Sequence, residues 1–122
     1  MKLRALIFAG LLAACTGERP LPQADLPASP MRIVSLDFCA DQYVLKLADR
    51  ENILALSPEA TMTHSYLREA AKGVPTVRPF AEDALALAPD LIVRSYGGGP
   101  NAERFFEQAG ICLLYTSDAA DE

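Results

Sequence analysis

The sequence predicts an α/β fold in which a doubly wound, Rossmann-like parallel sheet is covered by helices. Short apolar runs rich in β-branched residues alternate with helical patterns between residues 31 and 111. Helix-capping residues and glycines stand between these runs. The chain has 122 residues, of which 51% are hydrophobic and 22% charged, as in a globular domain. Strands that are apolar throughout and separated by amphipathic helices favour a parallel sheet buried on both faces.

The first strand and helix are the clearest elements. Residues 32–36 form a short β-branched apolar run, and Asp37 follows it as a candidate helix cap. Apolar residues then recur at helical spacing, which predicts that they form one inward face: Ala40, Tyr43, Val44, Leu47 and Ala48.

The next segment contains the second strand and a short helix. Residues 49–52 turn the chain, and residues 53–56 are predicted to be a strand. A largely polar loop covers residues 57–65. A short helix at 66–71 is ended by Gly73.

The second half repeats this alternation. Residues 75–77 are a weak third strand, and Ala81 to Ala88 form a helix closed by Pro89. Residues 91–93 are a fourth strand, and Asn101 is a candidate cap for a last helix. That helix is expected to turn four residues inward: Ala102, Phe105, Phe106 and Ala109. Ile111 is expected to begin a fifth strand.

Ligands of such sheets bind beyond the carboxyl ends of the strands. This rule brings together four loops: residues 37–39, 57–61, 78–80 and 95–97. Aromatic side chains on this rim would give a large planar or apolar ligand broad, rigid contact. The candidate ligand-binding residues are Asp37, Phe38, Cys39, Arg78, Phe80 and Tyr96. For each aromatic residue, a packing role without a ligand stays open.

Other chemistry has little support in the sequence. The formal net charge of −5 argues against a nucleic-acid partner. His64 is the single histidine, and one histidine is too few for a zinc or manganese site, so no metal site is expected. Two roles stay open for His64: a solvated side chain and an axial haem ligand. Cys39 stands at the start of a helix, and a buried packing thiol is favoured over a nucleophile. No nucleophile elbow or cysteine–histidine signature is present, and no cofactor is expected.

The N-terminal residues are typical of an export signal. Lys2 and Arg4 precede an uncharged apolar run that ends at Ala14, which is typical of a signal peptide at residues 1–14. Residues 12–15, Leu-Ala-Ala-Cys, resemble a bacterial lipobox in which Cys15 is lipidated. An ordinary secretory signal with a chance cysteine is the alternative. Residues 15–30 contain four prolines and are predicted to be an extended tether. Either signal places the mature protein in the periplasm or at the cell surface.

The last eleven residues look foreign to the domain. Residues 112–122, CLLYTSDAADE, match the translation of a transposase-derived sequencing adapter, and no helical or strand period is expected to continue through them. The alternative is a genuine C-terminus. On the adapter interpretation, the native reading frame is cut after Ile111.

An ordered set of motifs resembles the periplasmic binding proteins for iron complexes and cobalamin, which serve ABC importers. The set consists of RIVSLDFCADQ from Arg32, VPTV from Val74, PDLIV from Pro89, YGG from Tyr96 and NAER from Asn101. It covers residues 31–111, and the stretch from Pro89 looks most like the cobalamin-binding member.

The resemblance implies two α/β lobes joined by a long helix, with the ligand in the cleft between them. This chain would hold the N-terminal lobe, and the second lobe would follow Ile111. It implies capture of a ferric siderophore, cobalamin or haem without catalysis, and delivery to an ABC permease. Tyr96 matches a cleft aromatic that is Trp in the cobalamin-binding member, and Glu82 matches a glutamate that docks onto permease arginines. The alternative functions are a chelatase-like enzyme fragment and a membrane-tethered interaction domain.

Overall fold

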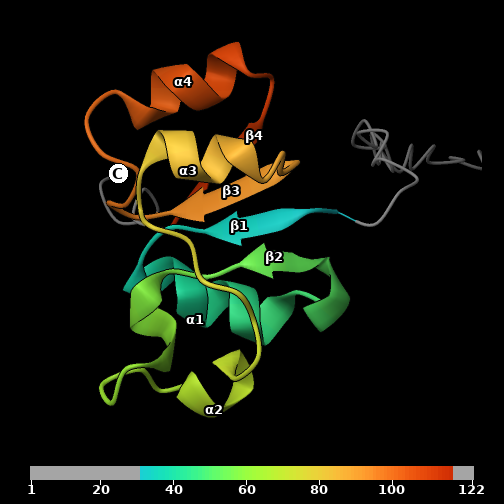
Figure 1. The fold of residues 1–122 in the computed structure, drawn as a ribbon, viewed down its shortest axis with the longest axis vertical. Coiled ribbons are helices and arrows are strands. Elements are labelled where there is room, and N and C mark those ends of the chain that lie inside the picture. Colours follow the sequence, from blue (N-terminus) through green and yellow to red (C-terminus); the bar gives the residue numbers. More distant parts are fainter. Residues whose placement is uncertain (1–30, 117–122) are drawn as a thin grey trace, which may run out of the picture.

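The computed structural model describes residues 31–116, and four parallel strands form its sheet (Figure 1). The strands are β1 (Ile33–Ser35), β2 (Ile53–Ala55), β3 (Leu91–Arg94) and β4 (Cys112–Tyr115). Their order is β2-β1-β3-β4, so β1 lies between β2 and β3. The predicted α/β fold with a parallel sheet is confirmed.

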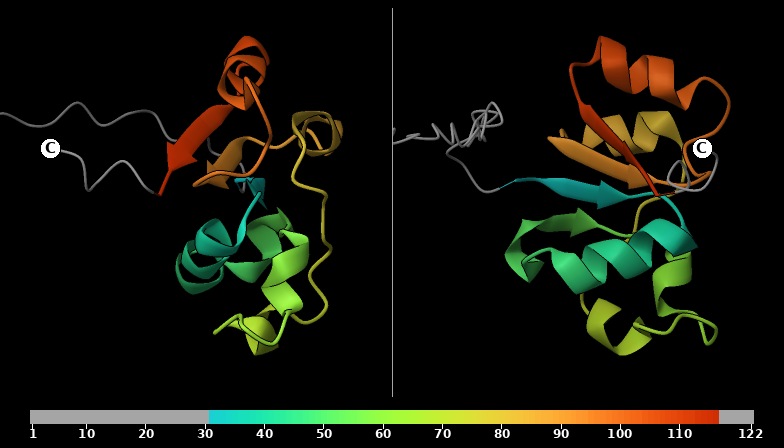
Figure 2. Two further views of the ribbon diagram at one scale, coloured as in Figure 1. Left: turned by 90° about the vertical axis from the view of Figure 1, so that its left-hand side faces the viewer. Right: turned by 180° about the vertical axis from the view of Figure 1, so that it is seen from behind.

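Helices cover both faces of this sheet (Figure 2). The α-helices are α1 (Phe38–Leu47), α2 (Arg68–Ala71), α3 (Ala81–Ala86) and α4 (Ala102–Gln108). Two 3-10 turns, η1 (Arg50–Asn52) and η2 (Pro58–Thr61), flank β2. Helix α1 lies on one face, and α3 and α4 lie on the other. Short strands joined by helices on alternate faces are the doubly wound arrangement that the sequence predicted.

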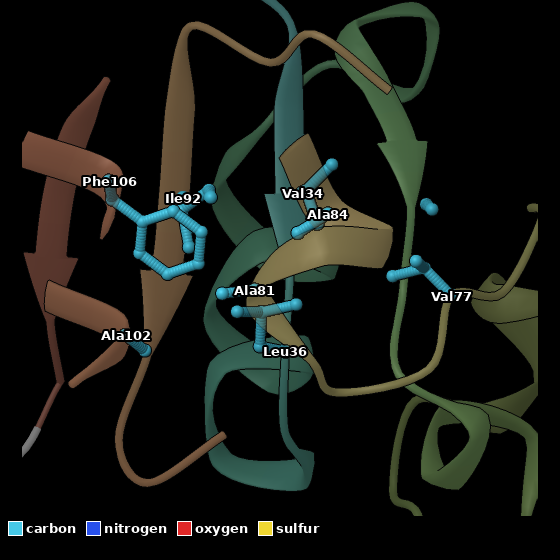
Figure 3. Packing of buried hydrophobic residues seen from close by; sticks show 9 residues of the cluster. Val34, Leu36, Val77, Ala81, Ala84, Ile92, Ala102 and Phe106 are labelled. Atoms are coloured by element: carbon cyan, nitrogen blue, oxygen red, sulfur yellow. The ribbon is translucent and has the colours of Figure 1, made fainter. Parts of the chain in front are cut away.

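The core consists of two apolar clusters, one on each face. Val34 and Ile92 of the sheet pack against Ala84 of α3 and Phe106 of α4 (Figure 3). On the opposite face, Ile33 and Val93 pack against α1. Adjacent residues of β1 and β3 therefore belong to opposite clusters, as the period of two in a strand requires.

Helix α4 buries less of its predicted inward face than expected. Ala102 and Phe106 are buried, as predicted, but Phe105 is 46% exposed and Ala109 is also exposed. The prediction for Phe105 and Ala109 is wrong because α4 contacts the sheet along a narrow stripe only. Phe106 alone of this pair of phenylalanines fills the space above β3.

Three local predictions are also corrected. Residues 75–77 form an isolated bridge between Thr76 and Leu56 instead of a strand, since Pro75 has no N–H to extend the ladder. Helix α3 ends at Ala86, because Ala88 takes a φ of 48° just before Pro89. Asn101 makes no side-chain capping bond and takes a φ of 59°, a conformation that asparagine tolerates.

Part of the predicted inward face of α1 is open. Ala40 and Val44 are buried, but Tyr43 is 52% exposed and Leu47 is 79% exposed. The two exposed side chains border an apolar groove next to Leu114 of β4. The expectation that Tyr43 and Leu47 point into the core is wrong because this side of α1 borders the groove, whereas α2 packs on the same cluster through Ala71.

The predicted last strand begins at Cys112, one residue later than expected. It pairs with β3 over Leu91 to Arg94. The expectation that no strand pattern enters residues 112–122 is wrong for Cys112–Tyr115, an apolar run whose exposure alternates. The adapter origin of this stretch stays a prediction. The signal peptide, Cys15, the tether and residues 117–122 lie outside the described residues. Within residues 31–116, no helix has the length and apolar character needed to cross a membrane.

The adjacent phenylalanines of α4 provide a matched test of the core. Phe106→Ala removes a fully buried ring and is expected to lower the free energy of unfolding by about 3–5 kcal/mol. Phe105→Ala removes a half-exposed ring and is expected to cost less than about 1.5 kcal/mol. Urea unfolding followed by circular dichroism measures both. Equal losses would contradict the assignment of Phe106 to the core.

Candidate functional site

The four loops predicted to share one rim do converge at the carboxyl ends of the strands. The N–H of Gly98 donates to the carbonyl of Pro79 at 2.9 Å, and Phe80 forms a bridge with Gly98. The loops surround a shallow cavity of about 300 Å³. The lining residues are Leu36, Ser57, Pro58, Glu59, Pro79, Tyr96, Gly97, Gly98 and Gly99.

Asp37 connects the loop after β1 to the loop after β3. One carboxylate oxygen, Oδ2, accepts from the N–H groups of Ser95 at 2.6 Å, Tyr96 at 3.0 Å and Gly97 at 3.0 Å. The other, Oδ1, accepts from the N–H of Ala40 at 3.1 Å and caps α1, as predicted. Burial alone would raise the pKa of Asp37, but the four N–H donors together lower it below 3.8.

Asp41 makes the corresponding connection to the loop after β2. Its carboxylate accepts from the N–H of Ser57 at 3.0 Å and from the Ser57 hydroxyl at 2.6 Å. The same hydroxyl oxygen accepts from the N–H of Glu59 at 3.1 Å. Burial raises the pKa of Asp41 above 3.8 despite the bonds from Ser57, and the nearby charge of Asp37 adds to the rise. Asp37 and Asp41 thus anchor two walls of the cavity to the first turns of α1.

The Tyr96 hydroxyl joins these two walls. It donates to Glu59 Oε2 at 3.1 Å, across the mouth of the cavity. Burial of the hydroxyl and the neighbouring Glu59 carboxylate raise the pKa of Tyr96 to about 12. Tyr96 is therefore a protonated donor at neutral pH, while 60% of the residue is exposed to solvent.

The other predicted aromatics also lie on the rim. Phe38 is half-buried, and its ring centroid is 5.2 Å from that of His64. Phe80 is 52% exposed beside Gly98. Tyr66 lies outside the four rim loops. It is exposed in the loop that Gln42 holds to α1, where the Gln42 amide donates to Ser65 Oγ and accepts from the N–H of Leu67.

The charged and thiol candidates have more local roles. Arg78 is exposed and pairs with Asp83 at 2.8 Å. Arg94 donates to the carbonyl of Tyr96 at 3.2 Å and lies 5.4 Å from the ring centre of Tyr115. Cys39 is an exposed free thiol in the first turn of α1, so the expectation of a buried packing thiol is wrong. Glu82 is exposed in the first turn of α3. Whether the predicted residues contact a ligand stays a prediction.

Two residues of the cavity were missed in the sequence. Glu59 is the partner of Tyr96, and its signal was an acid three residues after a predicted strand in a loop already placed on the rim. Gly97 lies in a predicted rim loop, but its close packing was not predicted: a Cβ there would lie 2.1 Å from the carbonyl oxygen of Leu36. The loop after β3 therefore packs directly on the end of β1. No group of three or more metal-ligating side chains occurs within the described part of the chain.

The solved structures that are similar to this chain are periplasmic haem-binding proteins, and they bear out the resemblance to the periplasmic binding proteins for iron complexes. The chain is similar to the periplasmic haem-binding protein HutB of Vibrio cholerae, with 27% identity, a TM-score of 0.52, and coverage of 71% of this chain and 34% of that one. It is similar to the periplasmic haem-binding protein RhuT of Roseiflexus sp. RS-1, with 28% identity, a TM-score of 0.53 and the same coverage. The haem-binding protein HmuT shares the fold, with 21% identity, a TM-score of 0.55, and coverage of 75% of this chain and 30% of that one.

The similarity extends over about a third of these solved proteins. Models of known protein families give no match to the chain. The curated proteins give no match either.

Asp37 is expected to make stability depend on acid pH. Its pKa is lowered in the folded state, so its stabilisation is present above 3.8 and is lost as the pH falls through the folded pKa. Asp37→Asn is expected to lower the free energy of unfolding by about 1.5–3 kcal/mol at pH 7. The difference from the unchanged chain should shrink as the pH falls below 3.8. Urea unfolding at a series of pH values measures this.

Asp49→Asn is the control for this prediction, because Asp49 is exposed and begins η1 without a side-chain bond. Its effect at pH 7 is expected to stay within about 0.5 kcal/mol. A constant difference between Asp37→Asn and the unchanged chain at every pH would contradict a role for the ionised carboxylate.

Close packing of Gly97 can be tested against Gly99. Gly97→Ala places a Cβ against the Leu36 carbonyl and is expected to destabilise the fold strongly. Gly99→Ala meets no atom within 4 Å, so it should cost only the strain of its positive φ, about 1–2 kcal/mol. Thermal and urea unfolding of both variants provide the comparison. A smaller loss for Gly97→Ala than for Gly99→Ala would refute the close approach.

Proposed function

We propose that the chain is the N-terminal lobe of an ABC-importer substrate-binding protein that captures haem outside the cytoplasmic membrane. The observation that carries the proposal is the set of exposed aromatics at the carboxyl ends of the strands, in a fold similar to periplasmic haem-binding proteins. The protein performs no catalysis and hands its cargo to a permease. A location in the periplasm follows from the same similarity and from the predicted export signal, with Cys15 as the proposed lipid anchor.

The shape of the rim supports a planar ligand. Tyr96 and Phe80 each expose about half of their surface beside the cavity, and Phe38 lies farther along the rim against His64. Covering an exposed aromatic ring with an apolar ligand surface removes it from water and lowers the free energy of the complex. The cavity itself is too small to enclose a porphyrin, so the ligand would lie across the rim and be covered from its other side by a second lobe.

The charges of the rim favour haem over an anionic ferric siderophore. Glu59 is the acid at the mouth of the cavity, and it would repel a ligand with dense negative charge. Arg78 already pairs with Asp83, and Arg94 donates to the loop after β3. Haem presents an apolar face with its carboxylates at one edge, so it can cover the aromatics with its propionates away from Glu59. Tyr96 on the rim and His64, which contacts Phe38, are side chains of the types that ligate haem iron.

Glu82 is proposed as the permease-docking residue. It is exposed in the first turn of α3, immediately after the rim loop that contains Phe80. A carboxylate there can meet an arginine of a partner without disturbing the core.

The proposal predicts that the chain binds ferric haem in preference to cobalamin and ferric siderophores. Titration of the full chain with each ligand, followed by Soret absorbance for haem and by calorimetry for all three, measures this. Tyr96→Ala is expected to weaken haem binding about tenfold, while Tyr96→Phe retains most of the affinity if the ring provides the contact.

Tyr43→Ala is the matched control, because Tyr43 is similarly exposed but lies on α1 beside the apolar groove instead of on the rim. It should leave haem affinity unchanged. Absence of binding across the whole panel would contradict the proposed function, and preference for cobalamin or a siderophore would overturn the choice of haem.

A further inference from the structure

The Asp37 carboxylate occupies a backbone anion site inside the protein. Three consecutive N–H groups, those of Ser95, Tyr96 and Gly97, point at its single oxygen Oδ2 at distances of 2.6–3.0 Å. Successive amides that converge in this way form a concave site suited to an anion. Asp37 is 1% exposed, so its carboxylate fills this site and faces away from solvent.

The side chain of the middle donor points the other way. Tyr96 gives its N–H to Asp37, while its hydroxyl reaches Glu59 at 3.1 Å on the opposite wall of the cavity. The backbone on either side has little freedom to move. Gly97 packs so closely on Leu36 that no Cβ would fit, and Arg94 holds the carbonyl of Tyr96 at 3.2 Å. The place of the Tyr96 ring is therefore determined by the backbone that Asp37 binds.

We propose that Asp37 is a positioning residue for the ligand site: it acts as a built-in anion that fixes the loop after β3 and so sets Tyr96 against Glu59. The effect on ligand affinity rests on the proposed function, in which Tyr96 contacts the ligand. The effect on the position of Tyr96 is independent of the proposed function. Asp37 itself is not expected to touch the ligand, since both of its oxygens accept backbone N–H groups.

Two substitutions separate this role from helix capping. Asp37→Ser retains a capping oxygen for α1 but is too short to fill the amide site. Asp37→Asn retains the shape and the cap, but its amide can place a donor where the three N–H groups need an acceptor. Asp49→Ser is the control, because Asp49 begins η1 without a side-chain bond.

Fluorine NMR of the full chain labelled with 3-fluorotyrosine reports on the place of Tyr96 without any ligand. The four tyrosine signals are assigned with single Tyr→Phe variants. The Tyr96 signal is expected to shift in both Asp37 variants, while those of Tyr43 and Tyr66 stay in place. Glu59→Gln should shift the Tyr96 signal in the unchanged chain but much less in the Asp37→Ser background, because the Tyr96–Glu59 contact is already lost there. If one Asp37 variant fails to fold, the other supplies the comparison.

Titration with ferric haem then tests the consequence for binding. Asp37→Ser is expected to weaken haem binding about as much as Tyr96→Ala, and the double variant should be no weaker than either. An unmoved Tyr96 signal in the folded Asp37 variants would overturn the positioning role, whatever happens to haem. Additive losses of affinity in the double variant would overturn action through Tyr96. A shifted Tyr96 signal in a chain that binds no haem would uphold the positioning role and contradict the proposed function.

Discussion

A single buried carboxylate, that of Asp37, determines how the loops of this lobe meet. A buried charge is costly unless it is fully hydrogen-bonded, and here four backbone N–H groups supply the bonds, one from the first turn of α1 and three from the loop after β3. Asp37 follows β1, which lies between β2 and β3, so the bonds act at the middle of the sheet edge. Two further backbone hydrogen bonds join neighbouring segments: the N–H of Leu36 donates to the carbonyl of Val93, and the N–H of Gly98 donates to the carbonyl of Pro79.

The second buried acid of α1 shows how burial and bonding compete. Asp41 is one helical turn after Asp37, but its hydrogen bonds, chiefly those from Ser57, do not offset its burial. The two carboxylates have opposite pKa shifts for this reason. Together they fix the walls that contain Glu59 and Tyr96 to one helix. The first turns of α1 thus set the spacing of the two cavity walls, and the Tyr96–Glu59 hydrogen bond joins the walls.

Local patterns in the sequence were sufficient for most of the fold. The apolar runs identified β1, β2 and β3, but most of β4 lies in the residues that were expected to carry no strand. Asp37 was identified as a helix cap because capping depends on residues three positions apart. Its bonds to Ser95, Tyr96 and Gly97 span up to 60 residues, and no local pattern encodes them. The helical period of α1 identified one apolar side but not what covers it, so Tyr43 and Leu47 were misplaced. The rim followed from topology, whereas Glu59 required the actual direction of the Tyr96 side chain.

The polar network under the rim explains how exposed aromatics can remain in fixed positions. Tyr96 and Phe80 are about half exposed and gain little packing energy of their own. Their backbone holds them instead: the N–H of Tyr96 donates a hydrogen bond to the Asp37 carboxylate, and Phe80 forms a β-bridge with Gly98. An aromatic surface ordered before the ligand arrives loses less conformational entropy on binding. The same rings would be poor recognition elements on free loops, so in the proposed function the buried charge beneath them would contribute to ligand affinity without touching the ligand.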